Sequence, residues 1–395
     1  MALTGGLVLV SVIVVAVASS ALLILLWPRW TGRTGILARV ALVAGHDVAL
    51  LVAVAVLFND HFGFFADWTD LGQALGVVSS ADGGVNATAG GDPRAAVAAV
   101  GTGGDPFPVS TSLPGPAPGM AVGVGGGVGG RQQRYLHFTV TGARSGARSQ
   151  ILVALPRGYA DPANRRRRYP VIETFPGYPG TPFNPSRALD ALVTQRRMAP
   201  AIVLSATMEI PRGRDTECVD GGGGAPAVET FLTQDVPEWA TQHLRVSLHR
   251  SGWATAGISA GGWCAAMAAM LHPDRYSAAI VLGGYFRPQF GSVYAPLPPA
   301  SAAAARYDLI SLARRRPPPI ALWLQTSPAD QVSFATSRDL LAAARAPLAV
   351  HSLVMSDTGH RLAVWLPLLP QAFTWLASCD PAFAPATASP DRTTW

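Results

Sequence analysis

The sequence predicts an α/β domain, with a mainly parallel sheet covered by helices on both faces, preceded by an N-terminal transmembrane helical hairpin. Two observations carry this prediction. From residue 131 onward, apolar strand-like segments alternate with helical patterns, which favours parallel strands connected by helices. The first 60 residues hold two long apolar runs, and the whole chain is 49% hydrophobic and only 14% charged, a balance that indicates a membrane component.

The first apolar run is long enough to cross a bilayer. No charged side chain occurs in residues 1–28, and a spanning helix needs about 20 apolar residues. A cleaved signal peptide is the alternative, but it would have a positively charged start and a shorter apolar stretch. A second apolar run covers residues 40–58. Residues 1–60 are therefore expected to form a two-helix hairpin.

The charges around the hairpin predict its orientation. Arg29, Arg33 and Arg39 lie in or beside the connection between the two runs. The flank after the second run carries Asp60, Asp67 and Asp70. Because cytoplasmic loops are enriched in arginine, the connection is expected in the cytoplasm. The prediction is a multi-pass protein of the cell membrane whose residues after about position 60 are extracytoplasmic.

Two ionisable residues, His46 and Asp47, lie inside the second apolar run. Such residues are candidates for function by default. We expect a polar contact within the hairpin, with a mechanistic role as the alternative. The aromatic residues that come next suit a membrane interface, so residues 61–79 are predicted to be an interfacial segment with a short helix.

Composition sets the remaining boundaries. Residues 80–130 are dominated by Gly, Ala, Pro, Val and Ser and are expected to form a flexible linker. The α/β domain is predicted over residues 131–380, with a C-terminal tail over 381–395.

The net charge of +6 comes from arginine alone. Its runs at 165–168 and 314–316 lie next to prolines or turn residues and are interpreted as solvated loops, not as a nucleic-acid surface. Motifs for zinc, phosphate or nucleotide binding do not occur, so no metal, cofactor or nucleic-acid partner is expected.

The stretch "GISAGGWC" at 257–264 is the candidate site of a nucleophile. Gly257, Ser259 and Gly261 fit G-x-S-x-G, in which a sharp turn from strand to helix exposes the serine hydroxyl and leaves room only for small neighbours. An apolar strand pattern precedes it and a helix of small residues comes after it. The alternative is a glycine-rich helix start with a capping serine.

A serine nucleophile needs a base and an acid that orients this base. After such a turn, the acid and then the histidine follow late strands of the sheet. Asp330 follows the strand pattern "IALWLQT", and His360 follows "LAVHSLVMS". Asp357 is the alternative acid, but it lies on the same loop as His360. The other histidines are weaker candidates because of their positions within or before these elements: His243, His249, His272 and His351.

The oxyanion of the reaction needs two backbone N–H donors. One is Ala260, which follows the serine. The other is expected near Gly177 or Tyr178 in "FPGYPG", after an earlier strand. A plain Pro-Gly turn is the alternative for this second position.

Together these segments resemble the esterase group of α/β-hydrolases, which includes esterase D-type enzymes, feruloyl esterases and secreted mycolyltransferases. The stretches that carry the resemblance are "YPVIETFPGYPG", "GISAGGWCAAMAAMLHPDRYSAAIVLGGYF", "SPAD" and "TGHRLAVWLPLLPQAFTWL". The resemblance implies an α/β-hydrolase fold over residues 131–380, a Ser259–Asp330–His360 triad, and Ala260 and Tyr178 as oxyanion donors. The hairpin and linker resemble membrane-anchored bacterial members.

Two departures from the family pattern matter. Many members carry His-Gly or Asp-Gly where this chain has Pro176-Gly177, which leaves the second oxyanion donor less defined. Mycolyltransferases usually have Glu at the acid position, so Asp330 favours the esterase branch.

Cys218 and Cys264 are expected to be neighbours, because the loop "RGRDTECVD" at 212–220 belongs to the same sheet edge as the nucleophile helix. Outside the cytoplasm a disulfide between them is reasonable, and two buried thiols are the alternative. Asp215, Glu217 and Asp220 are interpreted as a solvated loop, with the pocket mouth as the alternative.

The sequence thus predicts a membrane-anchored extracytoplasmic serine esterase that acts on an ester or on an acyl-lipid or acyl-sugar substrate. Two alternatives stay open. One is a mycolyltransferase-like acyltransferase that moves an acyl chain to a cell-envelope sugar. The other is a non-catalytic envelope-binding protein with the same fold.

Overall fold

The computed structural model describes residues 6–30, 32–77, 84–99, 134–291 and 294–386. The chain divides into two compact units. The first comprises residues up to 83 together with 327–332 and 355–364, and the second comprises 84–326, 333–354 and the residues from 365 onward. Each unit is described by itself.

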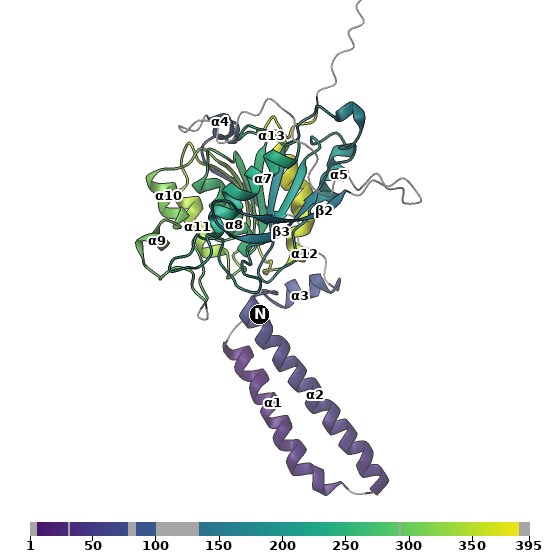
Figure 1. Ribbon diagram of the computed structural model, residues 1–395. Coiled ribbons are helices and arrows are strands. Elements are labelled where there is room, and N and C mark those ends of the chain that lie inside the picture. The colour runs from purple at the N-terminus through teal and green to yellow at the C-terminus, as the bar shows by residue number, and fades with distance from the viewer. Residues whose placement is uncertain (1–5, 31, 78–83, 100–133, 292–293, 387–395) are drawn as a thin grey trace, which may run out of the picture. The chain divides into compact units, whose positions relative to one another are not determined.

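The first unit is built on a helical hairpin (Figure 1). Its elements are α1 (Gly6–Leu26), η1 (Trp27–Arg29), α2 (Gly32–Phe62) and α3 (Trp68–Ala74). Gly6–Arg29 and Gly35–Phe62 are both long and apolar enough to span a membrane. Most of their large apolar side chains are exposed, which suits lipid contact. This agrees with the predicted transmembrane hairpin.

Inside the hairpin, the His46 Nδ1 atom lies 2.9 Å from the Ser19 hydroxyl oxygen. The predicted polar contact is therefore confirmed for His46, and Asp47 is exposed on the helix surface. A third apolar stretch, Leu362–Cys379, also meets the length and hydropathy criteria, but 44% of its apolar window is buried inside the protein.

The second unit contains one sheet of nine strands in the order β1-β9-β8-β7-β6-β4-β5-β3-β2. The strands are β1 (Val85–Gly90), β2 (Tyr135–Thr141), β3 (Arg148–Ala154), β4 (Val171–Phe175), β5 (Ile202–Ala206), β6 (Trp253–Ile258), β7 (Ala278–Leu282), β8 (Ala321–Thr326) and β9 (Ala349–Val354). The six strands from β5 to β9 in this order are parallel. The hairpin of β2 and β3 and the strand β1 add antiparallel edges, so the predicted mainly parallel sheet is confirmed.

Helices connect and cover the strands. They are α4 (Pro93–Ala98), α5 (Ser186–Thr194), α6 (Val228–Thr230), η4 (Phe231–Asp235), α7 (Val236–His243), α8 (Ala260–Leu271), α9 (Ala302–Ala305), α10 (Leu309–Arg315), α11 (Phe334–Ala343), α12 (Leu362–Trp365), η5 (Leu366–Leu368) and α13 (Leu369–Cys379), with the short turn η3 (Pro162–Asn164). The connection from β4 to β5 through α5 runs toward the β2 edge of the sheet. The connections from β6 to β7 through α8 and from β8 to β9 through α11 run toward the β1 edge. Because parallel crossovers are right-handed, α5 lies on one face and α8 and α11 lie on the other (Figure 1).

The core lies along the central strands. Every residue of β4, β5, β6, β7 and β8 is buried. This explains why their sequences are continuous apolar runs rather than alternating patterns, since helices cover both faces. Trp253, Trp263 and Trp323 are the largest fully buried side chains.

The structure differs from the predicted linker at its start. Residues 85–98 form β1, which pairs with β9, and α4; residues 100–133 lie outside the described residues. Strand β1 adds to the edge through its backbone while most of its side chains stay exposed, so it needs no apolar pattern. The predicted tail also begins later than 381, because Phe383 is buried and its carbonyl accepts from Ala199 N at 2.8 Å.

Arg250 holds α4 to the body of the second unit. Its guanidinium donates to the carbonyls of Val97 (2.6 Å), Ala99 (2.9 Å), Tyr276 (3.0 Å) and Pro319 (2.7 Å), and Nε donates to Pro273 O at 2.6 Å. Burial lowers the pKa of this guanidinium, but five carbonyl partners compensate the loss of water.

We expect Arg250→Lys to lower the free energy of unfolding by about 2 kcal/mol, because an ammonium cannot reach all five carbonyls and charged hydrogen bonds contribute about 1.5–3 kcal/mol each. Urea unfolding followed by tryptophan fluorescence measures this. Arg166→Lys, at an exposed position of the 165–168 run, is the matched control. Equal small changes in both variants would contradict the role assigned to Arg250.

Candidate active site

Ser259 occupies the turn between β6 and α8. Its backbone has φ +55° and ψ −125°, a conformation that residues other than glycine rarely adopt. Ser259 N donates to Leu282 O at 2.9 Å, and Ser259 O accepts from Gly262 N at 2.8 Å, so neighbouring strand and helix hold the turn. The strained turn matches the geometry expected for an exposed nucleophile at a helix start.

Glycines permit the close approach of backbones around this turn. A Cβ atom at Gly257 would overlap the carbonyl of Gly261, and one at Gly261 would overlap the carbonyls of Phe175 and Pro176. The small residues on both sides of Ser259 are therefore required by space, as the sequence pattern predicted.

The turn after β4 lies directly beside Ser259. A Cβ atom at Gly177 would be 3.3 Å from Ser259 Cβ and 3.9 Å from its hydroxyl oxygen. Tyr178 follows with a half-exposed side chain, whose hydroxyl donates to Gly213 O at 3.3 Å. Ala260 begins α8, where backbone N–H groups have no intrahelical acceptor. The structure thus brings Ser259, Ala260 and Gly177 together.

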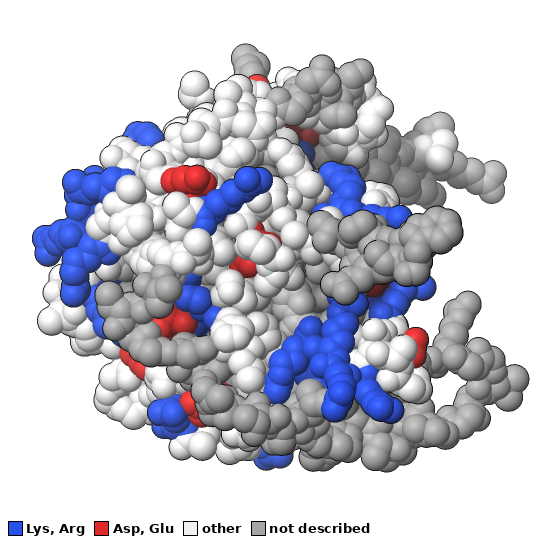
Figure 2. Space-filling view, turned by 90° about the horizontal axis from the view of Figure 1, so that it is seen from above, with Lys and Arg blue, Asp and Glu red and all other residues white. Residues whose placement is uncertain are grey.

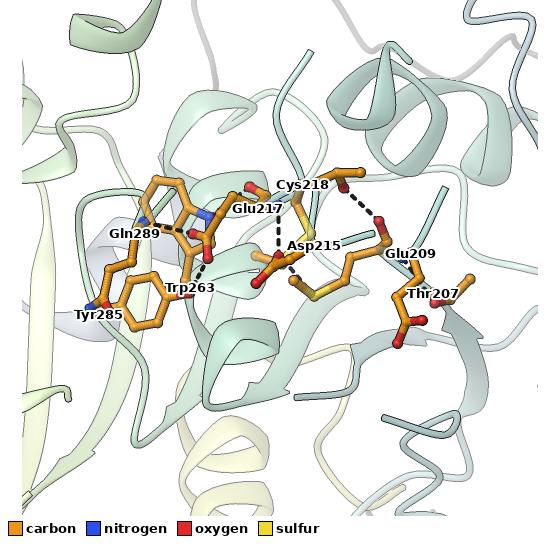
Figure 3. Close-up of a disulfide and its surroundings, with 11 residues drawn as sticks. Thr207, Glu209, Asp215, Glu217, Cys218, Trp263, Tyr285 and Gln289 are labelled. Carbon is orange, nitrogen blue, oxygen red and sulfur yellow. Dashed lines mark hydrogen bonds between the residues drawn. A yellow bond between two sulfur atoms is a disulfide. The ribbon is translucent and has the colours of Figure 1, made fainter. Parts of the chain in front are cut away.

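The loop 212–220 is pinned to α8 by a disulfide between Cys218 and Cys264, with Cα atoms 5.7 Å apart (Figure 3). A second attachment is the indole Nε1 of Trp263, which donates to Glu217 O at 2.8 Å. The Trp263 ring stacks on the Tyr285 ring at a centroid distance of 6.0 Å. Since Cys264 and Trp263 belong to α8, which begins after Ser259, the loop is fixed relative to this helix.

The burial of Glu217 shows that the interpretation of this loop as solvated is wrong at this residue. Its side chain is 1% exposed; Oε1 accepts from the Tyr285 hydroxyl at 2.5 Å and Oε2 from Gln289 N at 3.0 Å (Figure 3). Burial, and then the nearby Asp215 charge, raise the pKa of Glu217 to about 8. Sequence reasoning missed this because its partners, Tyr285 and Gln289, are distant in the chain. Asp220 is held as well, and accepts from the Thr230 hydroxyl at 2.6 Å.

Asp330 and His360 form a buried pair within the first unit. His360 Nδ1 lies 3.0 Å from both carboxylate oxygens of Asp330, and the two residues are 8% and 1% exposed. Thr358 N donates to the Ser327 hydroxyl at 3.2 Å and so connects the two loops. Asp357 is exposed, so the geometry favours Asp330 over Asp357 as the acid that orients His360.

The remaining histidines have other surroundings. His272 Nε2 lies 2.7 Å from Glu229 Oε1, and Arg306 and Tyr307 bind the same carboxylate. These partners outweigh the effect of burial and lower the pKa of Glu229 to about 2. The cluster connects α6 to the end of α8 and fits the structural role expected for His272. Within the described part of the chain, no group of three or more metal-ligating side chains gathers.

The basic surface of the protein is made by arginine, since the chain has no lysine. On the face seen in Figure 2, arginines occur in separate groups among acidic and uncharged residues and form no continuous stripe. Arg165, Arg166 and Arg167 are exposed, as expected of the solvated run.

The chain is similar to known proteins in sequence and in fold. The family model described as "Putative esterase" matches residues 142–374, more than half of the chain. A solved structure of a ferulic acid esterase is similar over 63% of this chain and 97% of its own, with a TM-score of 0.52 and 20% identity. An S-formylglutathione hydrolase from Agrobacterium tumefaciens aligns over 62% of this chain and 94% of its own, at 17% identity and a TM-score of 0.49.

A relative by sequence is an uncharacterized protein of Corynebacterium glutamicum, 29% identical over 144 residues. The alignment covers 35% of this chain and 33% of that protein, so the chain matches a third of the relative's length.

Glu217 predicts a pH dependence of stability. Its folded pKa is above its ordinary value of 4.5, so the stability it contributes is complete below about pH 4.5 and is lost as the pH rises toward 8. Glu173, buried in β4 beside the Tyr276 hydroxyl (2.7 Å), acts in the same direction because burial raises its pKa to about 8.

In Glu217→Gln, thermal unfolding midpoints measured from pH 5 to 8.5 should fall less steeply than in the wild type. Glu173→Gln in the same chain should flatten the profile further. Glu238→Gln, at a partly exposed carboxylate, should keep the wild-type slope. A wild-type slope in Glu217→Gln would show that Glu217 is ionised in the folded protein.

Proposed function

Because the chain belongs to the esterase family whose model matches residues 142–374, we propose that it is a membrane-anchored serine esterase with Ser259 as nucleophile, His360 as general base and Asp330 as its orienting acid. The observation that carries the proposal is the strained Ser259 turn with Gly177 against it. A capping serine needs neither a positive φ nor a second loop packed on it.

Chain connectivity supports the assignment of the triad. Ser259, Asp330 and His360 follow β6, β8 and β9, which belong to one run of parallel strands. Parallel strands end at the same edge of a sheet, where ligands bind in open α/β folds. The order nucleophile, acid, histidine is also that of nucleophile-elbow hydrolases.

The chemistry follows from these roles. Asp330 accepts a hydrogen bond from the Nδ1–H group of His360, which leaves Nε2 as the basic nitrogen. His360 takes the hydroxyl proton as Ser259 Oγ attacks the ester carbonyl carbon. The ester C–O bond then breaks, the alcohol leaves with that proton, and an acyl-enzyme remains. Water attacks the acyl-enzyme with His360 as base, and the carboxylic acid is released.

Backbone donors would stabilise the negative oxygen of each tetrahedral intermediate. We assign these donors to Ala260 N–H and Tyr178 N–H, with Gly177 allowing the loop to approach Ser259. Such donors act on charge that develops only during the reaction, and loss of one costs about 10²–10³ in kcat.

The extracytoplasmic location of the domain is supported by the arginines between the two apolar helices and by the Cys218–Cys264 disulfide. Water as acyl acceptor is supported by the esterase family match.

A fluorophosphonate probe tests the nucleophile. It should label the wild type, and labelling should be lost in Ser259→Ala and slowed by about 10³-fold or more in His360→Ala, because the hydroxyl then has no base. Ser251→Ala, at another serine in a loop before β6, is the control and should be labelled normally. Equal labelling of Ser259→Ala would exclude Ser259 as the nucleophile.

Labelling of an introduced cysteine tests the topology. Met120→Cys in intact cells should react with a membrane-impermeant maleimide. A cysteine at Thr31 should react only after the cells are opened, because the arginine-rich connection is expected in the cytoplasm. The reverse pattern would place the esterase domain in the cytoplasm.

A further inference from the structure

The segment that directly follows α2 is bound to the loop that carries His360. We call residues 63–70 the juxtamembrane segment; it belongs to the same compact unit as residues 327–332 and 355–364. His360 N donates to Gly63 O at 2.8 Å, and Gly359 N donates to Asp70 Oδ2 at 3.0 Å. Two consecutive backbone amides of the histidine loop therefore find their acceptors in this segment.

Arg361 fixes the other side of His360 to the same segment. Its guanidinium binds both carboxylate oxygens of Asp70, and Nη1 also donates to Phe64 O at 2.9 Å. The guanidinium lies 4.9 Å from the centre of the Phe65 ring. Such bidentate arginine–carboxylate pairs fix the relative orientation of the two side chains as well as their distance.

Asp70 is the centre of this contact. It is 0% exposed and accepts from Ala66 N at 2.9 Å, from Gly359 N and from Arg361. Removal of one member of a buried pair leaves the other charge without compensation, which is strongly unfavourable. Asp70 therefore holds its own segment and the histidine loop in one arrangement.

The backbones approach too closely for a side chain at Gly359. A Cβ atom there would overlap the carbonyl of Phe64 and lie 2.9 Å from that of Gly63. Close packing, hydrogen bonds and an ion pair thus all join the histidine loop to the juxtamembrane segment.

We propose that the juxtamembrane segment is a positioning element of the active site, with Asp70 and Arg361 as positioning residues for His360. The proposal rests on the proposed role of His360 as general base. By holding the backbone at 359, 360 and 361, the segment fixes the position of the His360 imidazole relative to Asp330. The hairpin then does more than anchor the chain, because the carbonyl of Gly63, directly after α2, accepts a hydrogen bond from the backbone N–H of His360.

The test uses the full chain purified in detergent and a short-chain p-nitrophenyl ester. In Asp70→Ala, kcat should fall by about 100-fold while KM changes by less than about twofold, since a misplacement of about 1 Å in a catalytic group can cost 10² in rate. Asp70→Asn retains the volume and should show a smaller loss, and Asp70→Glu should restore part of the rate. Asp60→Ala, an exposed carboxylate near the end of α2, is the matched control and should keep the wild-type kcat.

Hydrogen exchange separates positioning from general destabilisation. Amide exchange in a peptide over residues 356–361 should rise in Asp70→Ala and Asp70→Asn, while peptides from β6 and β7 keep wild-type exchange. Arg361→Lys provides a second route if Asp70→Ala does not fold: kcat should fall by about 10-fold, because one ammonium replaces a two-pronged contact.

Wild-type kcat in Asp70→Asn and Arg361→Lys would overturn the proposal, and so would a loss of kcat accompanied by faster exchange throughout the sheet. Ser259→Ala and His360→Ala, assayed in parallel, separate this proposal from the proposed function. If they retain turnover, the triad assignment fails. If they are inactive while the Asp70 variants are not, only the positioning role fails.

Discussion

The close backbone packing around Ser259 is the constraint on which the rest of the domain depends. The first turn of α8 lies so near the ends of β4 and β6 that Gly257 and Gly261 have no room for a side chain. Within this packing Ser259 has a positive φ. The strain is sustained because β6 is buried on both faces and bonded to β4 and β7 along its length. The surrounding sheet thus maintains a backbone conformation at Ser259 that an isolated turn would not keep.

Near this turn the protein buries two carboxyl side chains. Glu217, in the disulfide-bonded loop, accepts a hydrogen bond from the Tyr285 hydroxyl, and Glu173, inside the sheet, accepts one from the Tyr276 hydroxyl. Burial raises the pKa of both carboxyls to about 8. A neutral buried carboxyl can make such hydrogen bonds without the free-energy cost of an isolated buried charge. The helix α8 is held to the 212–220 loop by the Cys218–Cys264 disulfide and by the hydrogen bond from the Trp263 indole to Glu217 O.

The histidine side of the proposed triad is organised differently. Asp330 and His360 lie on loops that share a compact unit with the hairpin, and their loop is fixed by Asp70 and Arg361 from segments nearly three hundred positions apart in the chain. The contact on this side is a charged pair, Asp70 with Arg361.

The sequence by itself determined the features that arise from local pattern. Alternating apolar segments predicted the parallel sheet, two long apolar runs predicted helices able to span a membrane, and the small residues around Ser259 predicted the strained turn. Each of these features depends on neighbours within a few residues. Only the tertiary structure decided that Asp330 rather than Asp357 meets His360, that Glu217 is buried, and that residues 85–98 add a strand and a helix to the domain. The contacts of Asp70 with the histidine loop belong to the same group. These outcomes depend on contacts between segments far apart in the chain, and such contacts leave no periodic trace in the residues that make them.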